Sequence, residues 1–177
     1  AIVFFVGAVA EEYPDCVSFF GEDVDIGSQT FSNLNLDSFS DYSVQLEEVR
    51  RGKLAVDAAG NLYSRVFRAP NGVTDENIYS LLSRNDILAD FSYNNQYNVC
   101  LDGQFLKFDA AVYEGSLVSA SSILALEGGS QPMIIHFNSE NPIELISGYI
   151  SSLKTGSFVF VNGSELTGIN LTVRGDS

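Results

Sequence analysis

Tryptophan is absent from this sequence, histidine occurs once, cysteine twice, and lysine plus arginine only nine times. A structural zinc site of the Cys/His type needs four such ligands, so one histidine and two cysteines cannot assemble it. The nine basic residues stand against 23 acidic residues, which gives a net charge of −14. Nucleic-acid binders neutralise phosphates with clustered basic residues, and anionic membranes repel an acidic surface. Composition therefore argues against nucleic-acid and membrane-surface partners.

Long apolar runs are also missing. No run of about 18 apolar residues occurs, so the sequence predicts no membrane span. The opening AIVFFVGAVA resembles the apolar part of a signal peptide, but no basic residue precedes it, and we interpret it as a buried first strand. With 177 residues, of which 45% are hydrophobic, the chain is long enough to bury a core. We predict a single globular domain over residues 1–177.

The two cysteines, Cys16 and Cys100, are 84 positions apart. If the protein is extracellular, an even cysteine count predicts a disulfide between them. A bridge that closes such a loop would contribute about 4.5 kcal/mol in the loop-entropy model. The alternative is two unpaired buried thiols, because cysteine is among the most buried residue types.

Alternating apolar residues around glycine-containing turns dominate the chain. In residues 97–112 and 157–173, the pairs Asp102-Gly103 and Asn162-Gly163 are strong hairpin signals, because both turn positions favour positive φ. Residues 53–67 show the same pattern of two apolar runs around a turn. Further strands are predicted over residues 2–9, 16–20, 42–49, 117–126 and 133–137. The pattern predicts a mainly β fold, either a sandwich or a barrel or trefoil-like domain.

Two segments favour short helices instead. Residues 141–156 begin with Asn141 as the N-cap and Pro142 at the first helical position, and their apolar residues recur at helical spacing. Residues 74–91 begin with Thr74 as a cap and acidic residues in the first turn, followed by an apolar stripe that includes Ile78 and Leu81. We therefore expect one or two short helices in the β domain.

No catalytic residue can be assigned from the sequence. The single histidine, His136, lies in the strand-like MIIHF, and no Gly-x-Ser-x-Gly elbow accompanies it. We interpret His136 as a structural or exposed strand residue, and we favour a protein that is not an enzyme. A secreted glycoside hydrolase remains open as an alternative, since it needs only two suitably separated carboxyl groups. A secreted toxin or effector is a further alternative.

The acidic stretch GEDVDIG is the one candidate for a metal site. Its carboxylates are Glu22, Asp23 and Asp25, which are oxygen ligands that calcium prefers. The stretch lacks the D-x-D-x-D-G spacing of an EF-hand loop. We therefore expect no cofactor and keep calcium as the alternative.

The last twenty residues contain three short motifs. Asn162 and Asn170 each begin an N-x-[ST] sequon and are candidate glycosylation sites, which favours secretion. Arg174, Gly175 and Asp176 form the adhesive tripeptide that cell-surface receptors bind. A fixed tripeptide also occurs by chance, and a chain end is poorly pre-organised for binding.

Three stretches together resemble a known group of proteins. They are FFVGAVAEEYPDCVSFFGEDVDIG, GKLAVDAAGNLYSRVF and DGQFLKFDAAVY. Their succession of strands and turns is similar to that of the non-catalytic N-terminal domains of fungal secreted cell-wall mannoproteins. The resemblance implies a secreted protein at the cell surface or in the cell wall, with a structural or adhesive role and a glycan or protein partner. This is the function that we predict from the sequence.

Overall fold

The computed structural model describes residues 1–72, 77–92, 97–108, 110–126, 128–129, 131–138 and 140–175. The chain divides into two compact units. Unit 1 comprises residues 1–108 and 161–177, and unit 2 comprises residues 109–160. The single domain expected from the sequence stays a prediction, because compact units within one chain can belong to one cooperative fold.

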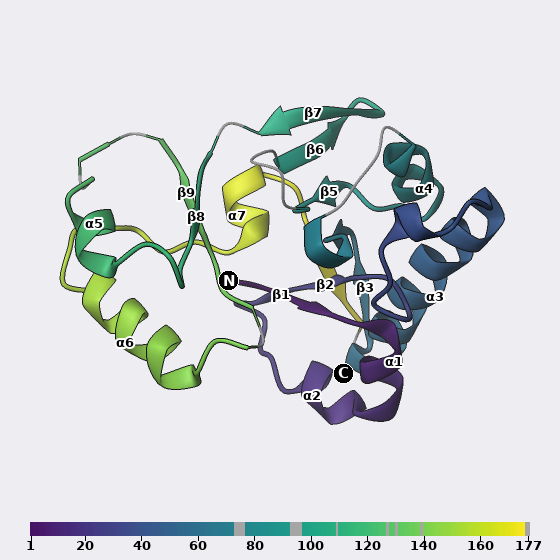
Figure 1. Cartoon of the computed structure of the whole chain (residues 1–177), viewed down its shortest axis with the longest axis horizontal. Coiled ribbons are helices and arrows are strands. Elements are labelled where there is room, and N and C mark those ends of the chain that lie inside the picture. Colours follow the sequence, from purple (N-terminus) through teal and green to yellow (C-terminus); the bar gives the residue numbers. More distant parts are fainter. Residues whose placement is uncertain are drawn as a thin grey trace. The chain divides into compact units, whose positions relative to one another are not determined.

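A six-stranded sheet forms the centre of unit 1 (Figure 1). The first four strands in its order β1-β2-β4-β5-β6-β7 are parallel, and β6 and β7 continue it in antiparallel fashion. The strands are β1 (Ile2–Phe5), β2 (Asp25–Ser28), β4 (Val66–Phe67), β5 (Ala89–Asp90), β6 (Tyr97–Leu101) and β7 (Gln104–Phe108). A separate antiparallel pair, β3 (Leu62–Ser64) with β10 (Thr172–Arg174), attaches the C-terminal segment to unit 1.

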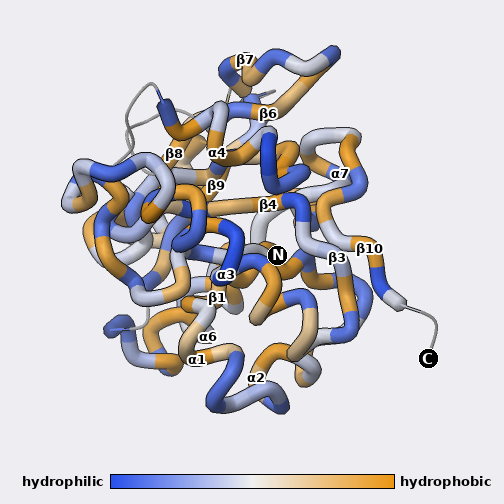
Figure 2. The backbone as a smooth tube through the Cα atoms, turned by 90° about the vertical axis from the view of Figure 1, so that its right-hand side faces the viewer, coloured by the Kyte–Doolittle hydropathy of each residue, from blue (hydrophilic) through white to orange (hydrophobic). Residues whose placement is uncertain are grey.

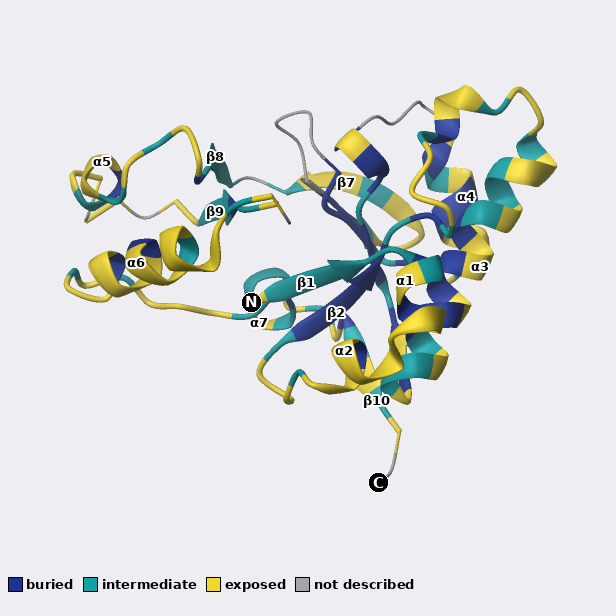
Figure 3. Ribbon diagram, turned by 60° about the horizontal axis from the view of Figure 1, so that its bottom comes forward, coloured by how far each residue is buried: buried dark blue, intermediate teal, exposed yellow. Residues whose placement is uncertain are grey.

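Helices cover one face of this sheet. They are α1 (Gly7–Glu12), α2 (Pro14–Ser18), α3 (Tyr42–Gly60) and α4 (Ile78–Arg84). Ile26 of β2 packs with Val17 of α2 and Val56 of α3, and Phe67 of β4 packs with Leu82 of α4. Figure 3 shows β2 buried along its length and the outer sides of the helices exposed. The core of unit 1 therefore lies between the parallel strands and these helices.

The longest helix, α3, occupies sequence that we predicted to be a strand (42–49) and the first half of a hairpin (53–67). Asp41 caps it by accepting a hydrogen bond from the Ser43 N–H, and Asn61 ends it in the left-handed conformation. Val49 and Val56 are buried at helical spacing, and hydrophobic and hydrophilic residues alternate along the turns (Figure 2). The cap and the spacing of the buried residues, rather than the short alternating run, decide the local structure.

The prediction of a mainly β fold is wrong for the same reason elsewhere in the chain. Residues 16–20 lie in or directly after α2, and residues 117–126 contain the helix α5 (Ala120–Leu124). Asn162 does not form a hairpin turn but caps α7 (Gly163–Thr167), where its side chain accepts from the Glu165 N–H. Short apolar runs do not distinguish a strand from one buried turn of helix.

Several predicted elements are confirmed. Asp102 and Gly103 have φ angles of 50° and 81° and connect β6 to β7 as a hairpin. The helix expected within residues 74–91 is α4, although Thr74, its expected cap, lies outside the described residues. None of the described helices is both long enough and apolar enough to cross a membrane.

Unit 2 contains a parallel pair of strands and two helices. The strands β8 (Ala111–Glu114) and β9 (Met133–His136) pair in parallel, and the helices are α5 and α6 (Ile143–Leu153). Ile123, Tyr149 and Leu153 form its buried core. The strand predicted over 133–137 and the helix predicted over 141–156 are confirmed, and α6 begins directly after Pro142.

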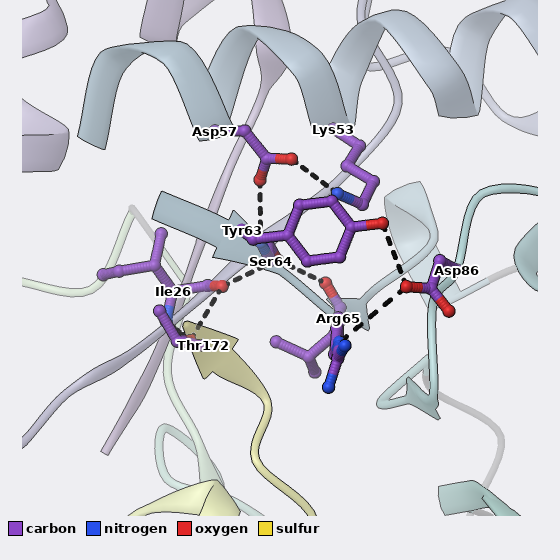
Figure 4. Close-up of polar contacts among 9 residues, drawn as sticks. Ile26, Lys53, Asp57, Tyr63, Ser64, Arg65, Asp86 and Thr172 are labelled. Atoms are coloured by element: carbon purple, nitrogen blue, oxygen red, sulfur yellow. Dashed lines mark hydrogen bonds and ion pairs between the residues drawn. The ribbon is translucent and has the colours of Figure 1, made fainter. Parts of the chain in front are cut away.

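A polar cluster in unit 1 connects α3 to β3 near the amino ends of β4 and β5 (Figure 4). Lys53 is buried and forms an ion pair with Asp57, whose other carboxylate oxygen accepts the Ser64 N–H at 2.8 Å. The Lys53 Nζ also lies 3.6 Å from the centre of the Tyr63 ring, and the Tyr63 hydroxyl donates to Asp86 at 2.9 Å. Burial raises the pKa of Asp57, against the opposing effect of the Lys53 and Ser64 hydrogen bonds. The cluster satisfies its own charges and is structural.

Replacing Lys53 with alanine should lower the free energy of unfolding by about 3 to 5 kcal/mol, because the Asp57 carboxylate would remain buried without its counter-charge. Urea unfolding of the two proteins measures the difference. Arg50→Ala is the matched control, since Arg50 lies on the same helix and pairs with Glu47 in solvent. An exposed ion pair of this kind contributes little to the free energy of unfolding. Equal urea midpoints for the two variants would contradict the structural role of Lys53.

Candidate functional site

The carboxyl ends of the four parallel strands of unit 1 meet at one edge of the sheet. Their last residues lie in one row, with Ser28 of β2 between Phe5 and Phe67, and Asp90 of β5 beside Phe67. Open α/β sheets bind ligands outside this edge, where the chain leaves each strand. We therefore take the loops that follow β2, β4 and β5 as the candidate site.

The loop after β2 is held against α3. The Phe31 N–H donates to the Glu48 carbonyl at 3.0 Å, and the Ser32 N–H and hydroxyl both donate to the Glu48 carboxylate, at 2.9 and 2.7 Å. The Arg51 guanidinium carbon lies 3.6 Å from the centre of the Phe31 ring. Backbone, carboxylate and cation–π contacts thus fix this loop to a long helix.

Two glycines let the backbones meet where this loop crosses the helices. A Cβ on Gly52 of α3 would lie 2.3 Å from the Gln29 carbonyl oxygen and 2.9 Å from the Thr30 carbonyl carbon. A Cβ on Gly7 of α1 would lie 2.7 Å from the Gly52 Cα. Real Cβ atoms do not approach so closely, so only glycine lets α1, α3 and the loop occupy these positions.

The loop after β4 is joined to the loop after β2. The Arg68 N–H donates to the Ser28 carbonyl at 3.1 Å, and the Asn71 side-chain amide donates to the Asn35 side chain at 2.9 Å. Asn33 and Asn71 both adopt the left-handed conformation, with φ angles of 60° and 53°. Non-glycine residues in this region are uncommon, and they concentrate at ligand-binding sites.

Asp90 ends β5 in a buried position. Its carboxylate accepts hydrogen bonds from the Ser92 hydroxyl and from the Ser92 N–H, and the Ser92 hydroxyl accepts the Ala69 N–H at 2.8 Å. Burial raises the pKa of Asp90 to about 6, against the opposing effect of the Ser92 hydrogen bonds. Asp90 is only 1% exposed, so its present contacts stabilise the edge and do not reach solvent.

The exposed part of the edge is rich in hydrogen-bonding groups without a negative charge. Gln29 and Arg68 are half-buried, and Ser32 and Asn33 are exposed. Amide and hydroxyl groups donate to and accept from neutral polar ligands such as sugar hydroxyls and acetamido groups, and a guanidinium group donates to them. These residues were not predicted from the sequence. Their signal is that β2 and β4 are each followed directly by a polar residue, Gln29 and Arg68.

The predicted calcium ligands are not brought together. Glu22 and Asp23 are exposed, whereas Asp25 is buried in β2 and binds the Ser164 N–H and hydroxyl with its two oxygens, each at 2.7 Å. In the part of the chain that the structure describes, no three His, Cys, Asp or Glu side chains form a group able to hold a metal ion. Asp25 instead anchors α7 to β2.

The two cysteines are free thiols in the structure, so the predicted disulfide is not formed. Cys16 is exposed on α2 and Cys100 is partly buried on β6. These elements lie on opposite sides of unit 1, as Figure 1 shows. A bridge would require Cα atoms within about 7 Å of each other.

The two sequons differ in their surroundings. Asn162 is partly buried and its side chain caps α7, whereas Asn170 is exposed. A glycan on the Asn162 amide nitrogen would crowd the N-cap of α7, whereas the exposed Asn170 side chain is accessible to a glycan. Glycosylation and an extracellular location both stay predictions.

The adhesive tripeptide is tied to the body of unit 1. The Arg174 guanidinium donates to the carbonyls of Gly21 and Val24, at 2.8 and 3.1 Å, and the Gly175 N–H donates to Asn61. Asp176 lies outside the described residues. With Arg174 held by two carbonyls, the motif is not presented as a free loop.

His136 belongs to unit 2. It ends β9 opposite Glu114 of β8 and is buried, which agrees with its interpretation as a structural strand residue rather than an exposed one. Its neighbour Ile135 and the following Phe137 pack against the core of unit 2.

Gly52→Ala should distort the candidate site. The added methyl group would collide with the backbone of Gln29 and Thr30, and overpacking of this kind costs about 1 to 3 kcal/mol. Thermal unfolding and the amide NMR shifts of residues 29–32 measure the effect. Gly148→Ala on α6 is the matched control, since a Cβ there meets nothing within 4 Å and should stabilise the helix by about 0.5 to 1 kcal/mol. Equal stability of the two variants would refute the close contact.

Asp90 should make stability depend on pH. Folding raises its pKa from 3.8 to about 6, so its contribution is fully present below pH 3.8 and is lost as the pH rises through about 6. The loss corresponds to roughly 3 kcal/mol. The stability of the wild type relative to Asp90→Asn should therefore fall by about this amount between acidic and slightly alkaline pH, as measured by urea unfolding. A difference that is constant with pH would contradict the raised pKa.

The parallel part of the sheet in unit 1 lies almost entirely in a segment that matches a known protein family. Residues 1–89 match the family model for polysaccharide deacetylase. This segment contains β1, β2 and β4 and the loops that follow them, and it ends at the first residue of β5. Among curated proteins, no sequence matches this chain.

Solved structures share the fold over nearly the whole chain. A family 4 carbohydrate esterase from Streptomyces lividans, in complex with acetate, is 14% identical, with 99% of this chain and 78% of that chain covered and a TM-score of 0.61. A peptidoglycan N-acetylglucosamine deacetylase is 16% identical, with 97% of this chain and 76% of that chain covered and a TM-score of 0.68. A CE4 family pseudoenzyme from Bacillus anthracis is 13% identical, with 94% of this chain and 54% of that chain covered and a TM-score of 0.65. At these identities the likeness shows the fold alone.

These findings overturn the function expected from the sequence. The stretches that resembled fungal mannoprotein domains lie mostly within the deacetylase match, so that resemblance is wrong, and with it the non-catalytic adhesive role. The carbohydrate esterases and deacetylases of this fold are enzymes, although it also includes pseudoenzymes. A glycoside hydrolase or a toxin finds no support either. Because the matched segment makes up half of the 177 residues, the chain belongs to the polysaccharide deacetylase family.

Proposed function

We propose that this chain removes acetyl groups from an N-acetylated polysaccharide that binds at the carboxyl edge of the sheet in unit 1. The observation that carries the proposal is the extent of the family match, which includes the loops at 29–35 and 68–72. These are the loops that the structure joins through Asn35 and Asn71 and supports from α3. The part of the chain assigned to the family thus builds two of the three loops at the edge.

The reaction splits the C–N bond of an acetamido group with water and yields acetate and a free amine on the sugar. It needs a base for the water and hydrogen-bond donors for the negative charge that develops on the carbonyl oxygen. At the edge, Arg68 and Gln29 supply donors to a bound sugar, and Asn33 supplies both a donor and an acceptor. Asp90 and Ser92 hold the ends of β4 and β5 beneath them.

Deacetylases of this family commonly use a metal ion. The described residues of this chain do not fit one. The edge offers amide, hydroxyl and guanidinium groups, and its Asp90 carboxyl is buried and hydrogen-bonded to Ser92. Catalytic zinc sites use three carboxylate, imidazole or thiolate ligands, and the described residues form no such group of three. We derive no step through a metal.

N-acetylglucosamine polymers are the proposed substrate class. One of the solved relatives acts on peptidoglycan N-acetylglucosamine, by its name. The amide, hydroxyl and guanidinium groups at the edge suit the neutral acetamido and hydroxyl groups of such a polymer. An anionic polymer would be repelled by a chain with a net charge of −14.

The proposal is tested by incubating the full chain with a fully N-acetylated glucosamine hexamer and measuring the acetate released. Acetate should appear together with product that has lost the mass of one or more acetyl groups. Arg68→Ala should lower kcat/KM about tenfold or more, equivalent to roughly 1.4 kcal/mol. Arg50→Ala is the control, since Arg50 is exposed on α3 and forms an ion pair with Glu47 on the same helix.

Two results would contradict the proposal. One is hexamer that binds or is cleaved without any release of acetate. The other is an equal loss of activity in Arg68→Ala and Arg50→Ala, which would place the reaction away from the edge.

A further inference from the structure

We infer that Ser92 is a positioning residue that holds Arg68 in place for the polysaccharide through its hydrogen bonds to Ala69 and Asp90. The inference rests on the proposed function. It concerns a residue outside the segment that the family model matches, since that match ends at residue 89.

Ser92 joins two strand ends. Its hydroxyl donates to the Asp90 carboxylate and accepts the Ala69 N–H at 2.8 Å, and its own N–H donates to the same Asp90 oxygen at 2.9 Å. Ser92 is 3% exposed and Asp90 1%, so water does not replace these bonds when one is lost. A buried group left without its partner costs far more than an exposed one.

Arg68 lies between two fixed points. Its own N–H donates to the Ser28 carbonyl of β2, and the N–H of the next residue, Ala69, donates to Ser92. The Phe91 N–H, directly after β5, donates to the carbonyl of Phe67, the residue before Arg68. The backbone of the half-buried Arg68 is therefore set by β2 on one side and by Ser92 on the other.

The carboxylate form of Asp90 makes the arrangement sensitive to protons. Ser92 donates two hydrogen bonds to it, and these bonds favour the charged form. Tyr79 of α4 is the titratable group that interacts with Asp90 across the core. Asn98 of β6 lies opposite Asp90 in the sheet, with Lys107 of β7 beyond it, and Arg68 follows the neighbouring strand.

The experiment compares Ser92→Ala with Ser64→Ala in the full chain. Ser64 is a matched control because it is also buried and its hydroxyl also donates a hydrogen bond within the sheet, to the Ile26 carbonyl at 2.8 Å, but near the opposite edge. Binding of the fully N-acetylated glucosamine hexamer is measured by calorimetry. Ser92→Ala removes both hydrogen bonds of the hydroxyl and should weaken binding about five- to tenfold, whereas Ser64→Ala should leave affinity unchanged.

A double-mutant cycle separates positioning from general destabilisation. If Ser92 acts through Arg68, Arg68→Ala should cost much less affinity in the Ser92→Ala background than in the wild type. Carbon-13 NMR of the Asp90 carboxyl should show its titration midpoint raised in Ser92→Ala, because a hydrogen bond to the carboxylate is lost, and unmoved in Ser64→Ala.

Two readouts do not depend on binding. In Ser92→Ala the Ala69 amide proton should exchange faster and the Arg68 Nε–H resonance should shift, with neither change in Ser64→Ala. If the wild type does not bind the hexamer but these changes occur, the proposed function fails and the Ser92–Arg68 connection stands. Equal effects of the two variants on affinity, or unchanged Ala69 and Arg68 signals in Ser92→Ala, would overturn the inference.

Discussion

Close backbone packing around Gly52 is the constraint on which the candidate site depends. At this point Gly7 of α1 and Gly52 of α3 let the two helices and the loop after β2 approach closely, and a single methyl group on Gly52 would collide with the Gln29 carbonyl. Glu48, one turn earlier in α3, binds the same loop through Phe31 and Ser32. The loop after β2 is therefore held by a 19-residue helix, and α3 positions its residues, such as Phe31 and Ser32.

The two ends of the parallel strands have different chemistry. Near the amino ends, Lys53, Asp57 and Tyr63 pair with one another and leave little for a ligand to bind. At the carboxyl ends, Asp90 and Ser92 form buried hydrogen bonds, and Arg68, Ser32 and Asn33 are partly or fully exposed. Charge pairing stabilises one end of the sheet, and polar groups that are partly or fully exposed characterise the other. This division is the reason for placing the carbohydrate at the carboxyl edge.

Part of the fold was accessible from the sequence. The Asp102-Gly103 hairpin was predicted correctly because positive φ at two adjacent positions is a strictly local requirement. The helix α6 was also predicted, because apolar spacing over eleven residues and an adjacent proline agree. Residues 42–49 were assigned to a strand because eight residues show alternation and helical spacing equally well. Their burial against Phe67 depends on a strand elsewhere in the chain.

Composition and local pattern by themselves determined what this protein does not contain and where its sharpest turns lie. One histidine, two cysteines and a charge of −14 excluded a Cys/His zinc site and argued against nucleic acid whatever the fold. Tertiary structure alone decided the candidate site. Gln29, Arg68 and Ser92 are far apart in the sequence and belong to no continuous motif. They approach one another because parallel strands place their carboxyl ends at a common edge, and that pairing is a property of the folded sheet rather than of any one segment.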